Sequence, residues 1–469
     1  MPLVCGVDSS TQSTKVEIRD AETGRLVSSG HAPHPVVNPP VSEADPTVWW
    51  DAFQVAFAAA GSPQVAAISV GGQQHGAVVL DAGFNPIRPA KLWNDTTTAP
   101  DADWLRSCLA GGDAAWAQAT GSVPLASFTI SKLSWLHRSE IDSWARLAHV
   151  CLPHDYLTYR LSGELVTDRG DASGTGYWSP ADERYRYDLL NLVDDGLDWS
   201  SMLPAVHGPI DAAGEWLGGP TGTVVGPGTG DNMAAALGLG AEPGDVVISL
   251  GTSGTISAVS ERPTADPSGA VAGFADATGR FLPLVCTLNA TKVTAAIGRL
   301  FELDFDQLDA EALAAPAGAG GVTLLPYFDG ERTPNRPTAT GSLAGLRSDV
   351  SRGQVVRAAF EGVVCGLLDG LDSLAEHTPV DGRLLLTGGG ARSAAYRQIL
   401  ADLSGRPVVV PGSSEAVALG AAAQAAAVLA RLPPEEVVEA WSVGPTTTVR
   451  PNEIDRDDIR HRYNRVRDQ

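Results

Sequence analysis

Residues 4–16 read Val4-Cys5-Gly6-Val7-Asp8-Ser9-Ser10-Thr11-Gln12-Ser13-Thr14-Lys15-Val16, and a stretch of the same kind returns at residues 246–256 as Val246-Val247-Ile248-Ser249-Leu250-Gly251-Thr252-Ser253-Gly254-Thr255-Ile256. Each copy has an apolar run, a tight cluster of Gly, Ser and Thr, and a second apolar run. This pattern is typical of a β-hairpin whose turn offers hydroxyls and backbone amides. Such a turn can hold phosphate oxygens, because small residues let the backbone approach an anion. One copy in each half therefore predicts two similar domains that act on one polyphosphate.

The length and the order of the patterns predict an α/β fold in two domains. A chain of 469 residues is too long for one core. Residues 214–230 are rich in Gly, Pro and Thr, so we place the junction near residue 240 and expect domains over 1–240 and 241–469. Strand and helix patterns alternate in both halves. We predict helices over 46–60, 291–303, 352–377 and 415–432, and strands over 65–70, 77–80, 383–387 and 407–410.

The composition argues against several classes of partner. The net charge of −22 disfavours binding to nucleic acid or to an anionic membrane. The five cysteines are scattered and lack C-x-x-C spacing, which indicates reduced thiols. No stretch approaches the ~18 apolar residues of a membrane span. We therefore expect a cytoplasmic protein. The sequence has no G-x-x-x-x-G-K-[ST] motif, so a nucleotide would be held without a Walker loop.

Asp231 is the leading candidate for catalysis. It lies in Gly228-Thr229-Gly230-Asp231-Asn232, directly before the apolar run at 233–239. Taken alone, an Asp in this place is more often a helix N-cap. The alternative is a general base that accepts a proton from a substrate hydroxyl, and a helix N-terminus would keep this carboxylate ionised. The flanking glycines would let a small polar substrate approach, and the Asn232 amide could contact sugar hydroxyls.

Asp8 ends the first apolar run, just before the turn hydroxyls. It could simply open the turn, or it could hold Mg²⁺ through water beside a transferred phosphoryl group. The second copy of the pattern has no acid in register, and a metal-binding acid is needed only once. This asymmetry favours the metal interpretation.

Three further loops carry candidate binding residues. Gln73, Gln74 and His75 stand between glycines at 71–76, which suits either polyol recognition or a merely solvated loop. The segment Lys91-Leu92-Trp93-Asn94-Asp95 could add an aromatic wall and polar contacts. The segment at 384–393 reads as a strand, a loop with Gly388, Gly389 and Gly390, and a helix start, which can direct amides at an anion. We expect nucleotide contact there.

Gly362, Gly366 and Gly370 are spaced by four within the predicted helix 352–377, so they share one face. Each costs roughly 0.5–1 kcal/mol relative to Ala. This stripe predicts that another backbone packs closely against it, in preference to a binding groove.

Taken in order, these segments resemble the FGGY carbohydrate kinases over nearly the whole chain, and most closely those members that act on D-xylulose. The matching segments are Asp8-Ser9-Ser10-Thr11, Gly72-Gln73-Gln74-His75-Gly76, Leu92-Trp93-Asn94-Asp95, Pro153-His154-Asp155-Tyr156-Leu157, Asp171-Ala172-Ser173-Gly174-Thr175, Gly230-Asp231-Asn232, Ser249-Leu250-Gly251-Thr252-Ser253-Gly254, Gly330-Glu331-Arg332-Thr333-Pro334 and residues 387–393. Single matches of this kind are weak, but a collinear series is specific.

The resemblance implies two ribonuclease H-like domains of the actin and hexokinase type around a central cleft. It implies that Asp231 deprotonates the terminal hydroxyl of D-xylulose for attack on the γ-phosphate of ATP. The implied assignments are Asp231 and Asp8 as catalytic, Asp8 at Mg²⁺, Gln74, His75, Trp93, Asn94, Asp95 and Asn232 at the sugar, and Thr11, Ser13, Gly251, Thr252, Gly389 and Gly390 at the nucleotide. A homodimer is also implied.

Two departures from the family pattern bear on the substrate. Gln74 stands where Met is usual, and Thr96-Thr97-Thr98 follow Asp95 where a pair such as Gly-Arg is usual. A sister kinase for ribulose, gluconate or glycerol is therefore the alternative. An actin-like ATPase or a sugar sensor without turnover is a third reading, but such proteins would lack the sugar loop and the Gly-Asp-Asn base.

Overall fold

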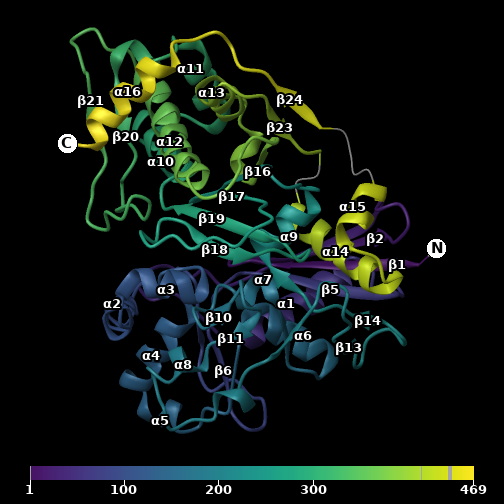
Figure 1. The fold of residues 1–469 in the computed structure, drawn as a ribbon. Helices are drawn as coiled ribbons and strands as arrows, with labels where there is room; N and C mark the ends of the chain where they lie inside the picture. Colours follow the sequence, from purple (N-terminus) through teal and green to yellow (C-terminus); the bar gives the residue numbers. More distant parts are fainter. Residues whose placement is uncertain (1, 413–414, 442–445) are drawn as a thin grey trace. The chain divides into compact units, whose positions relative to one another are not determined.

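The computed structural model describes residues 2–412, 415–441 and 446–469, which divide into two compact units. The first unit contains residues 1–241, 261–282 and 415–443, and the second contains 242–260, 283–414 and 444–469. The first unit thus adds two later segments to the stretch before residue 240. The last of these segments belongs to the first unit because its helix α14 (Ala416–Ala430) packs on strands of that unit (Figure 1).

The sheet of the first unit has the order β13-β14-β5-β1-β2-β3, and β15 also pairs with β5. Its strands are β1 (Leu3–Ser9), β2 (Ser13–Asp20), β3 (Leu26–Pro33), β5 (Ala67–Gly72), β13 (Gly214–Glu215), β14 (Val224–Val225) and β15 (Thr229–Gly230). Neighbours β1, β2 and β3 are antiparallel, whereas β5 is parallel to β1, β14 and β15. At the far edge, β13 is antiparallel to β14.

The second unit repeats this plan in the order β19-β17-β16-β22-β23-β24. Its strands are β16 (Val246–Leu250), β17 (Gly254–Ala258), β19 (Phe281–Thr287), β22 (Leu384–Thr387), β23 (Val408–Val410) and β24 (Thr447–Val449). Every pairing has the same sense as its counterpart in the first unit. The two quoted segments therefore form equivalent hairpins, β1–β2 and β16–β17, and the predicted two-domain α/β fold is confirmed.

Helices cover both faces of the first sheet. Gly6 of β1 pairs with Glu17, whereas Gly30 of β3 pairs with Val16, so the two glycines face opposite sides. A Cβ on Gly6 would lie 2.0 Å from the carbonyl oxygen of Ala418 in α14, and a Cβ on Gly30 would lie 1.9 Å from that of Ala56 in α1 (Pro46–Ala59). The glycines thus let one helix backbone pack tightly against each face.

The predicted helices are found with ends shifted by up to two residues. Besides α1 and α14, the described helices are α2 (Ala99–Cys108), α3 (Gly112–Thr120), α4 (Thr129–Ser139), α5 (Ile141–Trp144), α6 (Pro153–Ser162), α7 (Arg169–Ala172), α8 (Tyr187–Leu190), α9 (Asp231–Gly238), α10 (Thr291–Phe301), α11 (Phe305–Ala314), α12 (Arg352–Ala375), α13 (Ala394–Ser404), α15 (Pro434–Trp441) and α16 (Arg456–Arg467). Short 3₁₀ turns are η1 (Trp199–Ser201), η2 (Ala319–Gly321) and η3 (Gly389–Arg392). The smaller strands are β4 (Glu43–Ala44), β6 (Val78–Leu80), β7 (Ala90–Lys91), β8 (His149–Cys151), β9 (Val166–Asp168), β10 (Trp178–Ser179), β11 (Arg184–Tyr185), β12 (Ala205–His207), β18 (Ala272–Ala275), β20 (Thr323–Leu325) and β21 (Ser342–Ala344).

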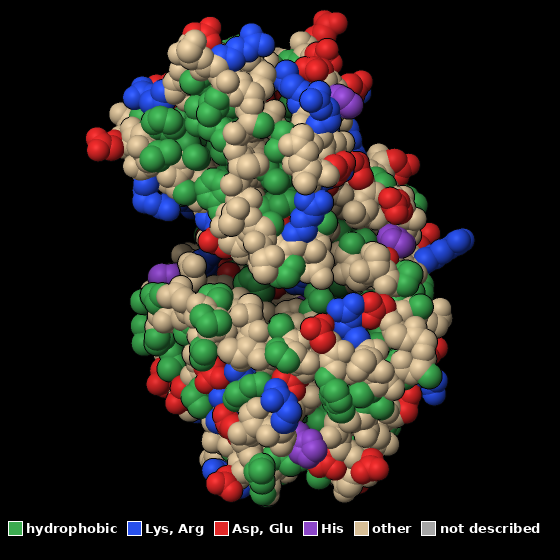
Figure 2. All heavy atoms as spheres, turned by 90° about the vertical axis from the view of Figure 1, so that its left-hand side faces the viewer, with side chains coloured by type: hydrophobic (Ala, Val, Ile, Leu, Met, Phe, Trp, Pro, Cys, Tyr) green, Lys and Arg blue, Asp and Glu red, His purple; other side chains and the backbone are tan. Residues whose placement is uncertain are grey.

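Within the described residues, no single helix has both the length and the apolar character to cross a membrane, although α14 and α15 meet that test when joined across a bend of 113°. On the face drawn in Figure 2, basic side chains are interspersed with acidic ones instead of forming a continuous patch.

The glycine stripe of α12 is only partly explained by a neighbouring backbone. A Cβ on Gly362 would lie 2.2 Å from the carbonyl oxygen of Leu324 in β20, which confirms the predicted close backbone. Gly370 instead faces the Ile256 side chain at 2.9 Å, and Gly366 has ordinary space, with the Tyr463 hydroxyl at 3.4 Å. The prediction is therefore wrong for these two positions.

Close packing of α14 on α9 yields a stability prediction. A Cβ on Gly420 would lie 1.9 Å from the carbonyl oxygen of Ala234, a backbone atom that cannot move aside alone. We expect Gly420→Ala to lower the free energy of unfolding by about 3 kcal/mol. Gly366→Ala is the matched control and should be neutral or stabilise by roughly 0.5–1 kcal/mol, because it replaces a helical glycine with space to spare. Urea unfolding of both variants checks this, and equal stabilities would contradict it.

Candidate active site

The predicted catalytic acids lie at one edge of the first sheet. Asp8 of β1 pairs with Gly71 of β5, and Thr229 of β15 pairs with the same Gly71 from the other side. The carboxyl ends of three parallel strands therefore meet in one row, which is where open α/β sheets bind ligands. Asp231 follows β15 directly, so Asp8 and Asp231 flank the end of β5.

Asp231 is the first residue of α9, and the N-cap position is taken by Gly230. The N-cap interpretation of Asp231 is thus not what the structure has. Its Oδ1 accepts a hydrogen bond of 2.8 Å from Nδ2 of Asn232. Burial, together with the nearby carboxylates of Asp8 and Asp171, raises the pKa of Asp231 to about 7. The expectation that the helix N-terminus keeps this group ionised is wrong in direction, because burial and two like charges outweigh the helix dipole.

Asp8 is buried, and its Oδ1 has no hydrogen-bond partner among the described residues. Its other oxygen lies 3.8 Å from Nζ of Lys15, which is itself 2.5 Å from Oε2 of Glu415. Burial raises the pKa of Asp8 to about 7, although the charge of Lys15 opposes the rise. The turn is closed instead by Ser10, whose amide and hydroxyl both donate to the carbonyl of Ser13 at 3.0 Å.

The surroundings of Asp8 suit a magnesium ion held by one carboxylate, and not a metal enclosed by several protein ligands. The described residues contain no group of three or more His, Cys, Asp or Glu side chains placed to hold a metal. Mg²⁺ usually binds one or two carboxylates and completes its shell with water and substrate phosphates. The unpaired buried oxygen of Asp8 suits such an ion, since a cation there would also offset the buried charge.

The loop at residues 71–76, the turn between β1 and β2, and the segment around Trp93 are joined by a chain of hydrogen bonds. The amide of Gln73 donates to the carbonyl of Ser9 at 3.0 Å. The Thr11 hydroxyl donates to Oε1 of Gln73 at 3.1 Å and accepts from Nε1 of Trp93 at 3.0 Å. The structure therefore brings the predicted phosphate residue Thr11 together with Trp93, a predicted sugar residue.

Gln74 and His75 are positioned by different means. Oε1 of Gln74 accepts a hydrogen bond of 2.7 Å from Nδ2 of Asn232. A Cβ on Gly230 would lie 2.7 Å from Cγ of Gln74, so this glycine makes room for a protein side chain, not for the substrate as predicted. The His75 ring stacks on Phe128 with 5.3 Å between centroids and an interplanar angle of 4°.

Several buried polar atoms at this sheet edge have no hydrogen-bond partner within residues 2–412, 415–441 and 446–469. They are Oδ1 of Asp8, Nε2 of Gln73, Nε2 of Gln74 and Oδ1 of Asn94. Most buried polar atoms in proteins are hydrogen-bonded, because an unpaired one costs free energy. These four atoms lie on connected loops and leave hydrogen-bonding capacity that a ligand could use.

In the second unit, the turn of the equivalent hairpin lies beside the start of α10. The amide and hydroxyl of Thr291 donate to the carbonyl of Gly251 at 3.0 and 2.8 Å, and the amide of Ala290 donates to the carbonyl of Thr252 at 3.1 Å. Gly389 borders open space, since a Cβ there would meet nothing within 4 Å.

Gly390 behaves differently from Gly389. A Cβ on Gly390 would lie 2.7 Å from the Leu250 side chain and 2.8 Å from that of Thr291. Packing inside the second unit thus accounts for Gly390, whereas Gly389 is the better candidate for nucleotide contact.

Models of two protein domains match this chain. The N-terminal domain of the FGGY family of carbohydrate kinases matches residues 3–238, and its C-terminal domain matches residues 246–429. The chain belongs to the FGGY family of carbohydrate kinases.

Individual FGGY relatives are similar over most of their length. A xylulose kinase of Streptomyces rubiginosus is 50% identical over 448 residues, which cover 94% of this chain and 91% of the relative. A xylulose kinase of Streptomyces coelicolor is 50% identical over 450 residues, with the same coverage. The crystal structure of xylulose kinase from Bifidobacterium adolescentis is 42% identical, covers 99% of both chains and superposes with a TM-score of 0.87.

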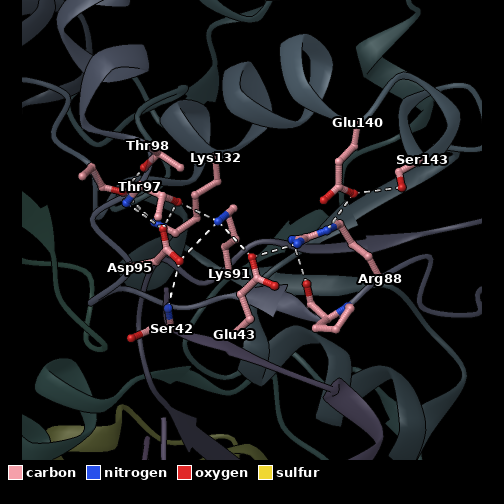
Figure 3. A network of polar contacts seen from close by, with 12 residues as sticks. Ser42, Glu43, Arg88, Lys91, Asp95, Thr97, Thr98, Lys132, Glu140 and Ser143 are labelled. Atoms are coloured by element: carbon pink, nitrogen blue, oxygen red, sulfur yellow. Dashed lines mark hydrogen bonds and ion pairs between the residues drawn. The ribbon is translucent and has the colours of Figure 1, made fainter. Parts of the chain in front are cut away.

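In this FGGY kinase, both carboxylate oxygens of Asp95 accept hydrogen bonds from other residues of the protein (Figure 3). Its Oδ2 accepts from the Ser42 amide at 2.9 Å and from Nζ of Lys91 at 3.2 Å. Its Oδ1 accepts from the amide and hydroxyl of Thr97 at 3.0 and 2.5 Å. Burial opposes ionisation, but these hydrogen bonds and the Lys91 charge together lower the pKa of Asp95. These contacts favour a positioning role for Asp95. Thr97, one of the three threonines that depart from the family pattern, donates two of the hydrogen bonds.

Lys91 connects this network to two further elements. Its Nζ lies 2.9 Å from Oε1 of Glu43 and 3.9 Å from the centroid of the Trp135 ring. Arg88 reaches the same Glu43 at 2.8 Å and Glu140 at 3.0 Å. The segment that carries Trp93 and Asn94 is thereby held to β4 and α4.

A buried cluster of His154, Asp155, Asp168 and Asp171 had no predicted role. Nδ1 of His154 lies 2.9 Å from Oδ2 of Asp171, and Nε2 lies 3.0 Å from Oδ1 of Asp155. Burial alone would lower the pKa of His154, but Asp155, Asp171 and Asp168 raise it to about 9. Asp168 also accepts from the Thr229 hydroxyl at 2.6 Å, so the cluster supports the strand that leads to Asp231. The closely spaced His and Asp residues at 154–155 and 168–171 were the signal available in the sequence.

Proposed function

We propose that this chain catalyses the ATP-dependent phosphorylation of D-xylulose to D-xylulose 5-phosphate. Support comes from the two relatives named xylulose kinase that are 50% identical over nearly the whole chain. The observation that carries the mechanism is the placement of Asp8 and Asp231 on either side of the end of β5. ATP is the phosphoryl donor in this proposal, and Mg²⁺ is the metal.

In the proposed reaction, Asp231 accepts the proton of the terminal hydroxyl of the sugar. The resulting oxygen forms a bond to the γ-phosphorus as the bond to the β-γ bridging oxygen breaks, and ADP leaves. A pKa near 7 suits this task, because the carboxylate is a stronger base than an ordinary Asp and is still ionised in part at neutral pH. The other contributions are orientation of the sugar and neutralisation of phosphate charge.

The remaining residues have binding roles in this proposal. Asp8 would hold Mg²⁺, which neutralises phosphate charge when bound. The sugar would be bound by Gln74, His75, Trp93, Asn94 and Asn232, with Asp95 positioning the Trp93 loop. The phosphates and the nucleotide would be bound by Thr11, Ser13, Gly251, Thr252 and Gly389, with Gly390 required for packing. The proposal also places the enzyme in the cytoplasm as a homodimer.

A sugar panel tests the substrate. The purified protein, with Mg²⁺ and ATP, should release ADP with D-xylulose at a higher kcat/KM than with D-ribulose, gluconate or glycerol, since this ratio measures discrimination. A preference for one of the other three would replace xylulose by that substrate. Hydrolysis of ATP that ignores every sugar would point to an ATPase and overturn the proposal.

The raised pKa of Asp231 predicts an acidic limb in the activity profile. The base must be ionised to accept the proton, and half of it is protonated at a pH equal to its pKa of about 7. We expect kcat/KM for the sugar to fall tenfold per pH unit below about 7, and to level off above it. A profile from pH 5 to 9 at saturating Mg²⁺ and ATP checks this. A limb near pH 4 would mean that Asp231 titrates like an exposed Asp.

A further inference from the structure

Gln74 carries a buried donor that the protein does not use. Its side chain is part of a residue that is only 4% exposed, and its Nε2 has no hydrogen-bond partner among the described residues. Its Oε1 accepts from Nδ2 of Asn232 at 2.7 Å, and the same Nδ2 donates to Oδ1 of Asp231 at 2.8 Å. One amide of Asn232 therefore bridges Gln74 and the proposed base.

The chemistry of these groups fixes which end of the Gln74 amide is unpaired. An ionised carboxylate can only accept, so Asn232 has to present its NH₂ group to Asp231. The same NH₂ group also donates to Gln74, so the side-chain oxygen of Gln74 must be the acceptor. The Nε2 of Gln74 is consequently directed away from Asn232 as a donor.

Packing holds this donor beside the backbone that carries Asp231. A Cβ on Gly230 would lie 2.7 Å from Cγ and 3.0 Å from Nε2 of Gln74, so the amide lies directly against Gly230. The side chain is therefore held on one side by Gly230 and on the other by Asn232. A donor fixed in this way is already oriented before a ligand arrives.

We propose that Nε2 of Gln74 donates to the sugar hydroxyl on the carbon next to the reacting one, which makes Gln74 a specificity-determining residue. In D-xylulose this is the hydroxyl on C4, since the reacting hydroxyl is on C5. The inference rests on the proposed function. Oxygens on neighbouring sugar carbons lie within hydrogen-bonding distance of each other. The side chains of Gln74 and Asp231 are likewise close together, because the one Nδ2 of Asn232 donates to both.

The consequence is selectivity against substrates that lack this hydroxyl. A site with a fixed donor binds an analogue without the matching oxygen poorly, because the buried N–H stays unpaired. Methionine has nearly the length of glutamine but no amide, so Gln74→Met removes the donor, together with the Oε1 that accepts from Asn232, while it keeps the volume. The variant should therefore tolerate loss of the C4 hydroxyl.

The test compares D-xylulose with 4-deoxy-D-xylulose and 3-deoxy-D-xylulose in the ADP-release assay. We expect the wild type to prefer D-xylulose over the 4-deoxy sugar by about 100-fold in kcat/KM. In Gln74→Met this ratio should shrink about tenfold, whereas the ratio for the 3-deoxy sugar should stay within about twofold. Gln64→Met is the matched control, because it removes an exposed amide that reaches only the Thr221 carbonyl, and its ratios should equal those of the wild type.

Each outcome decides the point. Equal 4-deoxy ratios in the wild type and Gln74→Met would overturn the inference, and would mean that a water or the protein itself pairs with Nε2. The wild-type comparison stands even if Gln74→Met does not fold: a 4-deoxy sugar used as well as D-xylulose overturns the inference alone. Failure of the wild type to phosphorylate D-xylulose would overturn the proposed function as well, before any variant is made.

Discussion

Asp231→Asn is expected to lower kcat by about 1,000-fold with D-xylulose as substrate, within the range of 100- to 10,000-fold usual for loss of a general base. The asparagine keeps the shape of the side chain and can still accept from Asn232, but it cannot take a proton. Because the lost interaction acts in the transition state, KM for the sugar should change little. Steady-state kinetics on the purified variant check this.

The control for this variant is Asp51→Asn, which neutralises an exposed acid on α1 of the same unit and should leave kcat unchanged. Circular dichroism and thermal unfolding should show that both variants fold like the wild type. An Asp231→Asn protein that retains more than a tenth of the wild-type kcat would remove Asp231 from the role of base.

Asp8→Asn is expected to lower kcat by about 100-fold and to raise the Mg²⁺ concentration required for half-maximal activity. The substitution replaces the carboxylate whose unpaired Oδ1 we propose as the metal ligand. Lys15 keeps Glu415 as a partner at 2.5 Å, so no buried cation is left unpaired. Titration of activity with Mg²⁺ at fixed ATP measures the effect.

The same variant should also lower the pKa of Asp231 in the protein without Mg²⁺. The negative charge of Asp8 is one of the causes that raise this pKa, so Asp8→Asn should shift the titration of the Asp231 carboxyl, followed by ¹³C NMR, to lower pH. If Asp8 only shaped the hairpin turn, Asp8→Asn would lose stability while the Mg²⁺ requirement stayed in place.

Local sequence patterns were sufficient to predict the α/β class and the paired hairpins. The cluster of small polar residues in each copy marks a turn, and the apolar runs beside it can only be strands of a covered sheet. The position of α14 could not be predicted in this way, because its Ala-rich pattern is apolar on all sides. Its partners are set by Gly6 and Gly420, which are far apart in the chain and permit close backbone contact.

The sequence named Asp8 and Asp231 as catalytic candidates but did not predict that both lie at one edge of the first sheet, or what their electrostatics are. Residues close in sequence to a helix start suggested a low pKa for Asp231, but the raising charges come from Asp8 and Asp171 in other segments. Likewise, the carboxylate of Asp95 accepts hydrogen bonds from Ser42, Lys91 and Thr97, and only the last two are near it in the sequence. Charge and burial depend on tertiary neighbours, which periodicity does not reveal.

Helix α14 also bears on how this protein is made. It covers β1 and β5, yet it is encoded more than 340 residues after β5 ends, as the bounds Ala67–Gly72 and Ala416–Ala430 show. During synthesis, α14 therefore cannot cover β1 and β5 until residues 416–430 have left the ribosome.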